Sequence, residues 1–298
     1  MTTLARARAA TFGAISLVNA IASGKGATAS VRLPTEAEVE LEASRGDWEV
    51  LVNGKKAESG LAIETVRRAI KGAGKDPDAY SGRVQTTSSV PIGVGLKTSS
   101  ASSTAIAIAV YAALGQRAFD PKKVLDCSVE ASLASGASVT GALDDAAGCL
   151  LGGVNMTDNL ARKVISSRLL DKKLRVLIRV PNTRSRREAV DPKFIRKFGG
   201  LTDLFFEMAV KGDYWMAMVL NGMAYSSILK YDPFPALRAV ELGALGAGLS
   251  GTGPAVAAVF DPSKQAEIDA VTKDWAADGS SVIETETNNE HGRLLTVG

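Results

Sequence analysis

A run of glycine and serine that leads directly into an apolar helix constrains this 298-residue chain more than any other feature. The small, apolar residues of Ser102–Leu114 predict a buried helix. Glycines before it let the backbone approach a polyphosphate closely, and the free N–H groups at a helix start favour anions. A flexible turn with serine as the helix cap is the alternative. The run is Pro91-Ile92-Gly93-Val94-Gly95-Leu96-Lys97-Thr98-Ser99-Ser100-Ala101-Ser102-Ser103.

The rest of the chain mixes strands and helices without strict alternation, which predicts an α+β fold with antiparallel sheets. A boundary between Asn155 and Asp171 would give two domains, residues 1–160 and 161–298, and Asn53-Gly54 predicts a hairpin turn. A glycine-rich loop is expected at Gly246–Gly253. Expected strands are Ala27–Leu33, Glu38–Glu42, Trp48–Val52, Arg83–Ser89, Leu174–Val180, Ala255–Phe260 and Ser281–Glu286. Expected helices are Leu61–Ile70, Pro121–Ala134, Thr140–Leu151, Thr202–Val210, Tyr214–Leu229 and Gln265–Ala276.

Composition excludes several classes of function. A net charge of +3 and 5% aromatic residues suit an anionic small substrate and do not suit nucleic-acid binding. Cys127 and Cys149 form no disulfide framework or zinc cluster, so a reducing cytoplasm is expected, and the single histidine, His291, argues against a Ser-His-Asp hydrolase. The apolar run Ala9–Ala22 is too interrupted by polar residues for a secretory signal, and no apolar stretch suits a membrane span. A homo-oligomer stays open.

Two other nucleotide-binding motifs do not fit. A Walker loop needs Gly-x4-Gly-Lys-Ser/Thr, and Gly24-Lys25-Gly26 lacks both the leading glycine and the hydroxyl. Gly246, Gly248 and Gly251 spell GxGxxG, but this motif follows a helical segment and precedes a strand. That order is the reverse of a dinucleotide-binding unit.

The glycine–serine run resembles the ATP-binding signature of the GHMP kinases, Pro-x3-Gly-Leu-x-Ser-Ser-Ala. It departs by one inserted residue, because Lys97 and Thr98 lie between Leu96 and the serine pair. The resemblance implies a two-domain fold, with an N-terminal part like domain 2 of ribosomal protein S5 and a ferredoxin-like C-terminal part. It also implies that Pro91–Ala101 binds ATP and that Ser100 binds Mg²⁺, with Ser99 as the next candidate.

Two adjacent carboxylates, Asp144 and Asp145, lie in the apolar stretch Ser138–Ala146. Burying such a pair is costly, and an acid pair at a helix N-terminus, stabilised by the macrodipole, is one explanation. The stretch also resembles the GHMP element that carries a catalytic Asp. A galactokinase-like alignment selects Asp144, which we favour as the base, whereas counting back from Gly152 in mevalonate-kinase fashion selects Asp145. Glu130 matches by position the glutamate that binds Mg²⁺ in relatives.

The segment Gly248–Ala255 resembles the C-terminal glycine motif of the GHMP kinases. Together, Asn19–Ala27, Ser138–Asp145 and Gly248–Pro254 resemble archaeal-type shikimate kinases. A plain helix–strand turn is the alternative for Gly248–Ala255. The resemblance implies an acceptor site that includes Asn19, Gly24, Lys25, Gly251, Thr252 and Gly253, with Lys25 also offsetting charge on the transferring phosphoryl group. A solvated turn lysine is the alternative for Lys25.

The basic run Thr183–Arg187 bears on the acceptor. An arginine can grip a carboxylate with two parallel hydrogen bonds, and Arg184 lies closest to the preceding strand, so we expect it to hold the carboxylate of shikimate. A solvated basic loop is the alternative.

The resemblance therefore predicts a transferase that uses ATP and Mg²⁺ to phosphorylate a shikimate hydroxyl. The product would be shikimate 3-phosphate, in the pathway to chorismate and the aromatic amino acids. Another GHMP activity, above all homoserine kinase, is the nearest rival. A non-catalytic sensor of nucleotides or sugar acids is the other alternative, and the pairing of Asp144-Asp145 with Ser99-Ser100 argues against it, since a binding module does not need the acids.

Overall fold

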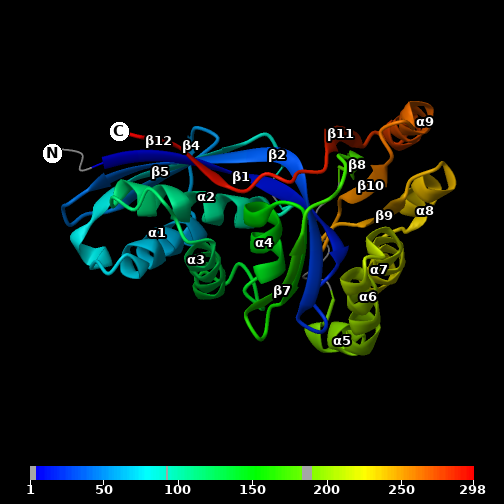
Figure 1. The fold of residues 1–298 in the computed structure, drawn as a ribbon, viewed down its shortest axis with the longest axis horizontal. Helices are drawn as coiled ribbons and strands as arrows, with labels where there is room; N and C mark the ends of the chain where they lie inside the picture. Colours follow the sequence, from blue (N-terminus) through cyan, green and yellow to red (C-terminus); the bar gives the residue numbers. More distant parts are fainter. Residues whose placement is uncertain (1–4, 92, 183–189) are drawn as a thin grey trace.

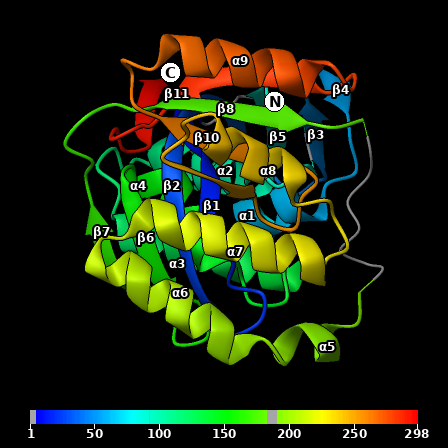
Figure 2. The same cartoon turned by 90° about the vertical axis from the view of Figure 1, so that its right-hand side faces the viewer.

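The computed structural model describes residues 5–91, 93–182 and 190–298, and it contains two sheets with helices packed on both (Figures 1 and 2). The larger sheet has eight strands, with the main order β12-β1-β2-β5-β3-β4 and with β6 and β7 attached beside β2. Its strands are β1 (Ala5–Val18), β2 (Lys25–Glu42), β3 (Trp48–Val52), β4 (Lys55–Lys56), β5 (Ser81–Ser88), β6 (Val154–Asp158), β7 (Lys163–Arg168) and β12 (Arg293–Val297).

The long hairpin of β1 and β2 joins the two halves of the molecule (Figure 1). The C-terminal part of β2, Thr35–Glu42, pairs with β5, whereas its N-terminal part, Lys25–Ala29, pairs with β6. The β1–β2 pairing shifts register between Phe12 and Gly13, near Pro34, which has no N–H to give to a ladder. The two ends of one hairpin therefore pair with different strands, and residues of its turn line the cavity described below.

Helices α1 (Gly60–Gly72), α2 (Thr98–Ala113), α3 (Pro121–Ala134) and α4 (Leu143–Leu151) cover one face of the larger sheet (Figure 1). A short 3₁₀ helix, Pro77–Ala79, precedes β5. Every residue of α2 except Ser99 and Ser102 is buried, because the helix lies between the sheet and the other helices. Its small side chains allow that close approach, so the composition of the segment accounts for its central position.

The smaller sheet has the order β11-β8-β10-β9. Its strands are β8 (Arg175–Val180), β9 (Gly246–Leu249), β10 (Val256–Phe260) and β11 (Ser281–Glu286), and its helices are α5 (Pro192–Arg196), α6 (Gly199–Lys211), α7 (Tyr214–Ile228), α8 (Phe234–Glu241) and α9 (Gln265–Ala276). Side chains alternate across β10: Ala257 and Val259 pack toward β1 and β2, whereas Val256, Ala258 and Phe260 pack toward α8 and α9. Both faces of this sheet are therefore buried.

The structure confirms the α+β class and most of the expected elements. It adds elements that were not expected, among them β6, β7, β12, α5 and α8, and it differs from expectation in four further ways. The apolar run at Ala9–Ala22 is largely strand β1, and the first half of the expected loop Gly246–Gly253 is strand β9. Helix α2 begins at Thr98, four residues before the expected start, so the Ser99-Ser100 pair lies within its first turn. The division expected at residue 160 falls inside the β6–β7 hairpin, and β12 returns to the first sheet.

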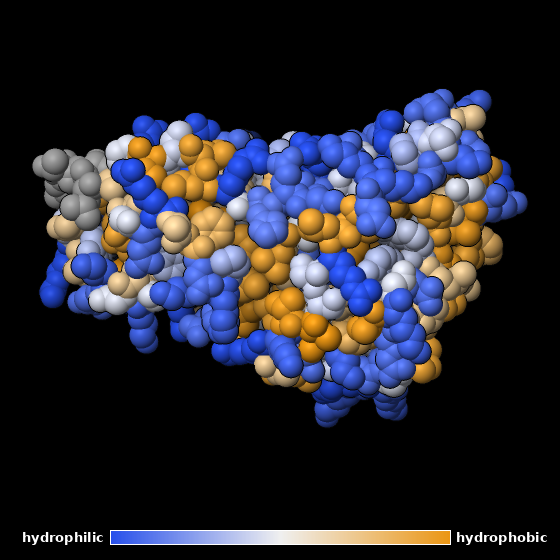
Figure 3. Space-filling view, viewed as in Figure 1, coloured by the Kyte–Doolittle hydropathy of each residue, from blue (hydrophilic) through white to orange (hydrophobic). Residues whose placement is uncertain are grey.

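The surface of one face is shown in Figure 3. Its upper edge is largely polar, and apolar side chains gather lower down, in the area of β7 and α6. Exposed apolar residues of these elements include Ile165 and Leu204. Among the described residues, no helix is long and apolar enough to cross a membrane.

Candidate active site

A cavity of about 570 Å³ lies where α2, α4, the β1–β2 turn and the residues after β9 meet. Five segments of the chain line it, and they come from both halves of the fold. The lining residues are Asn19, Ala20, Ile21, Gly93, Gly95, Lys97, Thr98, Ser99, Ser100, Ser132, Gly136, Ala137, Ser138, Val139, Thr140, Ala142, Asp144, Asp145, Val190, Pro192, Ile195, Arg196, Gly251 and Thr252.

The start of α2 forms one wall. Its N-cap residue, Lys97, has a left-handed backbone (φ 64°) and makes no side-chain capping hydrogen bond. The first N–H groups of α2 therefore have no side-chain cap there, and they lie at the positive end of the helix dipole. Gly95 (φ +94°) passes so close to the backbone of Ser250 that a Cβ atom would clash with the carbonyl oxygen. Glycine is thus required where this loop meets the other half of the fold.

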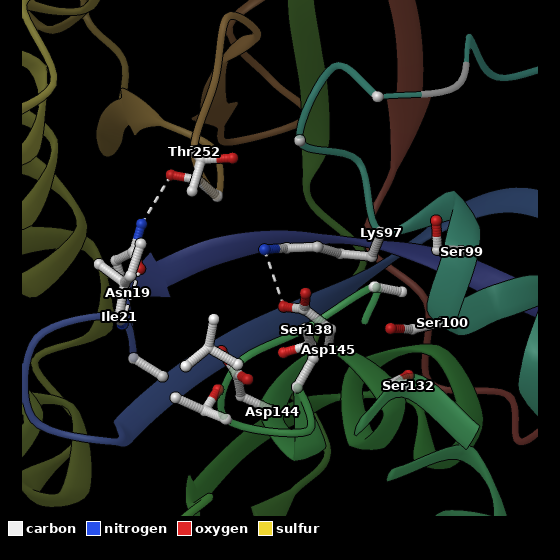
Figure 4. A pocket seen from close by; sticks show the side chains of 18 of the residues that line it. Asn19, Ile21, Lys97, Ser99, Ser100, Ser132, Ser138, Asp144, Asp145 and Thr252 are labelled. Atoms are coloured by element: carbon white, nitrogen blue, oxygen red, sulfur yellow. Dashed lines mark hydrogen bonds and ion pairs between the residues drawn. The ribbon is translucent and has the colours of Figure 1, made fainter. Parts of the chain in front are cut away.

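The Lys97 side chain crosses the cavity to Asp145 (Figure 4). Its Nζ lies 2.8 Å from Asp145 Oδ1, and the two side chains are 6% and 23% exposed. Burial by itself lowers the pKa of Lys97, but the charges of Asp145 and Asp144 outweigh it and raise the pKa above the ordinary value. Lys97 is therefore a stable cation in the middle of the cavity, and Asp145 keeps part of its carboxylate accessible.

Asp144 occupies a more enclosed position and is 5% exposed. Its Oδ1 accepts a 2.8 Å hydrogen bond from Asn159 Nδ2, and its backbone N–H donates to Asn159 Oδ1 at 3.1 Å. A Cβ atom on Gly26 would lie 2.5 Å from Asp144 Oδ2, so only glycine fits above this carboxylate. Burial first, and the charge of Asp145 second, raise the pKa of Asp144 to about 6, although Lys97 acts in the opposite direction. The two adjacent carboxylates thus have different environments.

Both carboxylates lie in the first turn of α4, which begins at Leu143. Its N-cap, Ala142, is left-handed and has no side-chain cap, so the helix dipole favours negative charge at this point. The explanation of the pair as helix-terminal acids is therefore correct. It is also compatible with a catalytic role, because the same turn lines the cavity.

The β1–β2 turn and the loop after β9 are tied together beside these acids. Asn19 Nδ2 donates to the carbonyl oxygen of Gly251 at 2.7 Å, and Asn19 Oδ1 accepts from the N–H of Ile21 at 3.0 Å (Figure 4). The N–H of Gly251 donates to Ser16 Oγ at 2.9 Å, and Ser250 Oγ donates to the carbonyl oxygen of Gly95 at 2.8 Å. This wall is therefore held by hydrogen bonds between segments that lie more than 150 residues apart.

The structure brings many of the predicted residues to the cavity. From the expected ATP segment these are Gly93, Gly95, Lys97, Thr98, Ser99 and Ser100; from the acceptor set they are Asn19, Gly251 and Thr252; Asp144 and Asp145 join them. Pro91, Val94, Leu96 and Ala101 belong to the same loop and helix but do not line the cavity, and Leu96 and Ala101 are core residues. Gly24 and Gly253 are not lining residues either. Ile92 and Arg184 lie outside the described residues.

Lys25 and Glu130 are placed differently from expectation. Successive residues of a strand face opposite sides, so Gly26 faces Asp144 while Lys25 points away and lies 3.4 Å from Asp203. On α3, Ser128 contacts Ser103 of α2 and Ser132 lines the cavity, but Glu130 is two residues from each, roughly 200° around the helix. It pairs instead with Arg68 at 3.2 Å. This arrangement supports neither the phosphoryl-contacting role for Lys25 nor the metal-binding role for Glu130.

Sequence reasoning included Lys97 in the ATP-binding segment but did not predict its ion pair with Asp145, and it missed Asn159, which contacts Asp144, and Arg196 of α5. The signal for Lys97 was present, since it is the residue inserted into the ATP-binding signature. No comparable signal marks Asn159 or Arg196, because each reaches the cavity region only through tertiary packing.

The donor set near α2 fits a nucleotide-bound Mg²⁺ better than a metal held by protein alone. Among the described residues there is no cluster of three or more His, Cys, Asp or Glu side chains suited to a metal ion. Mg²⁺ in nucleotide sites commonly takes one or two protein ligands and completes its shell with phosphate and water. The hydroxyl of Ser100, at the start of α2 in the cavity lining, is of the required kind.

Comparisons with known proteins agree with this fold. The model of the GHMP kinases N-terminal domain matches residues 59–153, and that of the GHMP kinases C-terminal domain matches residues 236–277. A homoserine kinase structure from Cytophaga hutchinsonii superposes with a TM-score of 0.76 at 18% identity and covers 97% of both chains. A Lactococcus lactis galactokinase in complex with galactose gives 0.74 at 12% identity over 97% of this chain and 95% of the other. These structural likenesses establish the fold.

Sequence similarity is much higher to curated archaeal proteins. The shikimate kinase of Methanothrix thermoacetophila is 37% identical over 292 residues, which cover 97% of this chain and 96% of that protein. The shikimate kinase of Methanocella arvoryzae is 38% identical over 288 residues, 95% of this chain and 94% of that protein. The chain therefore belongs to the GHMP kinase family.

Proposed function

We propose that this protein is a shikimate kinase, which transfers the γ-phosphoryl group of ATP to a hydroxyl of shikimate and forms shikimate 3-phosphate and ADP. The observation that carries the chemistry is the buried Lys97–Asp145 pair, which lies between the uncapped start of α2 and the wall formed by the β1–β2 turn. The full-length similarity to archaeal shikimate kinases supports the choice of acceptor over homoserine, for which the likeness is structural only.

The nucleotide side of the proposed reaction rests on α2. The triphosphate lies against Gly93, Gly95 and the first N–H groups of the helix, where the backbone is close and the dipole favours anions. Ser100 supplies a hydroxyl to the metal-bound phosphates. When bound, Mg²⁺ neutralises phosphate charge, and the protein has little covalent chemistry to perform beyond positioning and electrostatics.

Asp145 is the group that we assign to the acceptor hydroxyl. Sequence analysis favoured Asp144, but Asp144 is enclosed by Gly26 and Asn159, whereas Asp145 has a 23% exposed side chain in the cavity. The Asp145 carboxylate orients the hydroxyl and receives its proton as the oxygen bonds to phosphorus. Lys97 lies 2.8 Å from that carboxylate, so its cation is positioned to offset the negative charge on the transferring group.

An ADP-release assay tests the activity and the acceptor together. The protein would be assayed with ATP, Mg²⁺ and, separately, shikimate, homoserine, mevalonate and galactose. We expect turnover with shikimate alone and a product phosphorylated at the 3-hydroxyl, identified by NMR. Turnover of homoserine without turnover of shikimate would refute the acceptor assignment, and ATP binding without turnover of any acceptor would favour a sensor. The variant Asp145→Asn provides the background rate.

The cellular location is also part of this proposal. Cys127 and Cys149 are both buried and free, which is consistent with a reducing compartment such as the cytoplasm.

A further inference from the structure

The charges that line the cavity are unevenly compensated. Among the described residues, four charged side chains line the cavity: Lys97, Asp144, Asp145 and Arg196. Lys97 is bound to Asp145, so the centre of the cavity holds two carboxylates and one cation. An acceptor that carries its own carboxylate would be repelled by this centre unless a second cation received it. In the part of the chain that the structure describes, Arg196 is the remaining cation of the lining.

Arg196 has no ion-pair partner among the residues that the structure describes. Most other arginines of the described chain lie within reach of a carboxylate; Arg32, for example, contacts both Glu286 and Glu290. A guanidinium that faces a cavity and has no ion-pair partner among the described residues is available to a ligand. Its planar fork of donors matches a carboxylate, with which it can form two parallel hydrogen bonds.

The position of Arg196 favours the acceptor over the nucleotide. Arg196 is the last residue of α5. The preceding residue, Ile195, is buried in a hydrophobic cluster, and Ile21 of the β1–β2 turn packs against the same cluster. Ile21 and Asn19 lie across the cavity from Ser99 and Ser100 (Figure 4). Arg196 therefore belongs to the wall that faces the start of α2, at the side away from the phosphate-binding N–H groups.

We propose that Arg196 binds the carboxylate of the acceptor and so sets the specificity for an acidic substrate. This inference rests on the proposed function, and it assigns to Arg196 the kind of contact that sequence analysis expected of Arg184, which lies outside the described residues. In the bound state the carboxylate on C1 of the ring lies on Arg196, and the hydroxyl on C3 is presented to Asp145 in the centre of the cavity. The contact with Arg196 compensates the charge of the acceptor, which explains how a site with two acidic residues accepts an anion.

The test compares Arg196→Gln and Arg196→Lys with Lys197→Gln. Lys197 is the next residue along the chain and is likewise exposed, but it does not line the cavity, so its variant removes the same charge without removing a cavity contact. Steady-state kinetics would vary shikimate and ATP separately. We expect Arg196→Gln to raise KM for shikimate ten- to a hundredfold and to leave KM for ATP within twofold. Arg196→Lys should have an intermediate effect, because it keeps the charge and loses the fork.

A neutral acceptor isolates the contact itself. The methyl ester of shikimate lacks the charge, so the wild-type enzyme should use it poorly, and Arg196→Gln should impose little further loss on the ester. Thermal unfolding of each variant checks that the fold is retained. An unchanged KM for shikimate in Arg196→Gln, an equal loss in Lys197→Gln, or a rise in KM for ATP instead would each overturn the inference while the shikimate kinase activity stands. Failure of the wild-type protein to phosphorylate shikimate would overturn both.

Discussion

The two walls of the cavity are built in different ways. The wall at α2 comes from one continuous segment, Gly93–Ser100, and its function depends mainly on backbone N–H groups and small residues. The facing wall combines the β1–β2 turn, the loop around Gly251 and α5, which are distant in sequence and joined by hydrogen bonds such as that from Asn19 to Gly251. If the proposed roles of the walls are correct, nucleotide binding is a local property of the chain, whereas acceptor choice depends on the packing of its two halves.

The carboxylate pair stands where the two walls meet, and its variants should have the largest effects. If Asp145 orients the acceptor hydroxyl, Asp145→Asn should lower kcat about 10²–10⁴-fold, because the amide keeps the shape but cannot accept the proton. Binding of ATP, measured by calorimetry, should persist. Asp144→Asn should retain clearly more turnover than Asp145→Asn. The reverse ranking of the two variants would return the base role to Asp144, and wild-type kcat in both would remove the pair from catalysis.

Lys97 links the pair to the nucleotide wall, so its removal should be the next most severe change. Lys97→Gln should lower kcat by about tenfold to a hundredfold, since the cation beside the transferring group is lost. It should also lower the free energy of unfolding by up to about 3 kcal/mol, because Asp145 loses its buried counter-ion. A double-mutant cycle with Asp145→Asn, followed by chemical denaturation, measures the coupling. A coupling energy near zero would mean that the ion pair does not stabilise the site.

On the nucleotide wall alone, Ser100→Ala should have a moderate effect that is confined to ATP. We expect kcat/KM for ATP to fall about tenfold, which corresponds to one hydrogen-bonding or metal-ligand hydroxyl, while KM for shikimate stays constant. Ser102→Ala is the matched control, because Ser102 lies on the same helix outside the cavity lining. If Ser100→Ala behaves like Ser102→Ala, the hydroxyl role passes to Ser99.

The raised pKa of Asp144 leads us to expect that the stability of the fold depends on pH. Its pKa is raised in the folded state to about 6, so its contribution to stability is fully present below the ordinary value near 3.8 and is lost as pH rises through 6. Asp144→Asn does not titrate at this position. Wild type should therefore lose stability between pH 5 and pH 8 through this group, whereas Asp144→Asn should not. The free energy of unfolding of Asp144→Asn minus that of wild type should be larger at pH 8 than at pH 5. Denaturant unfolding at both pH values measures this difference, and a difference of the opposite sign would contradict the enclosed position of Asp144.

The contrast between the walls also explains what could be predicted from the sequence. The glycine–serine run, the acid pair and the hairpin turn at Asn53-Gly54 are short segments in which the local backbone conformation restricts the residue types. The turn and the helical position of the acid pair were predicted correctly, and so was a helix after the glycine–serine run, although it begins four residues earlier than expected. Strand β1 was missed because its apolar residues do not alternate: it is buried on both faces from Ala9 onward. Asn159 and Arg196 were missed because neither carries a local pattern, and the fold alone brings them near Asp144 and the cavity.

The smallest effect is expected at Lys25 and Glu130, two charged residues that were predicted to act in the site and that the structure places outside the cavity. Lys25 lies 3.4 Å from Asp203, with both side chains 39% exposed, and Glu130 pairs with Arg68 on the outer side of α3. Exposed ion pairs typically contribute about 0–1 kcal/mol, so Lys25→Gln and Glu130→Gln should each change the free energy of unfolding by less than about 1 kcal/mol. Each should also leave kcat and both KM values within twofold.

The most informative comparison is between Lys25→Gln and Lys97→Gln. Each variant removes one lysine that lies next to glycine, but only Lys97 reaches Asp145. A loss of kcat in Lys25→Gln as large as that in Lys97→Gln would show that the β1–β2 turn rearranges during turnover to bring Lys25 to the phosphoryl group.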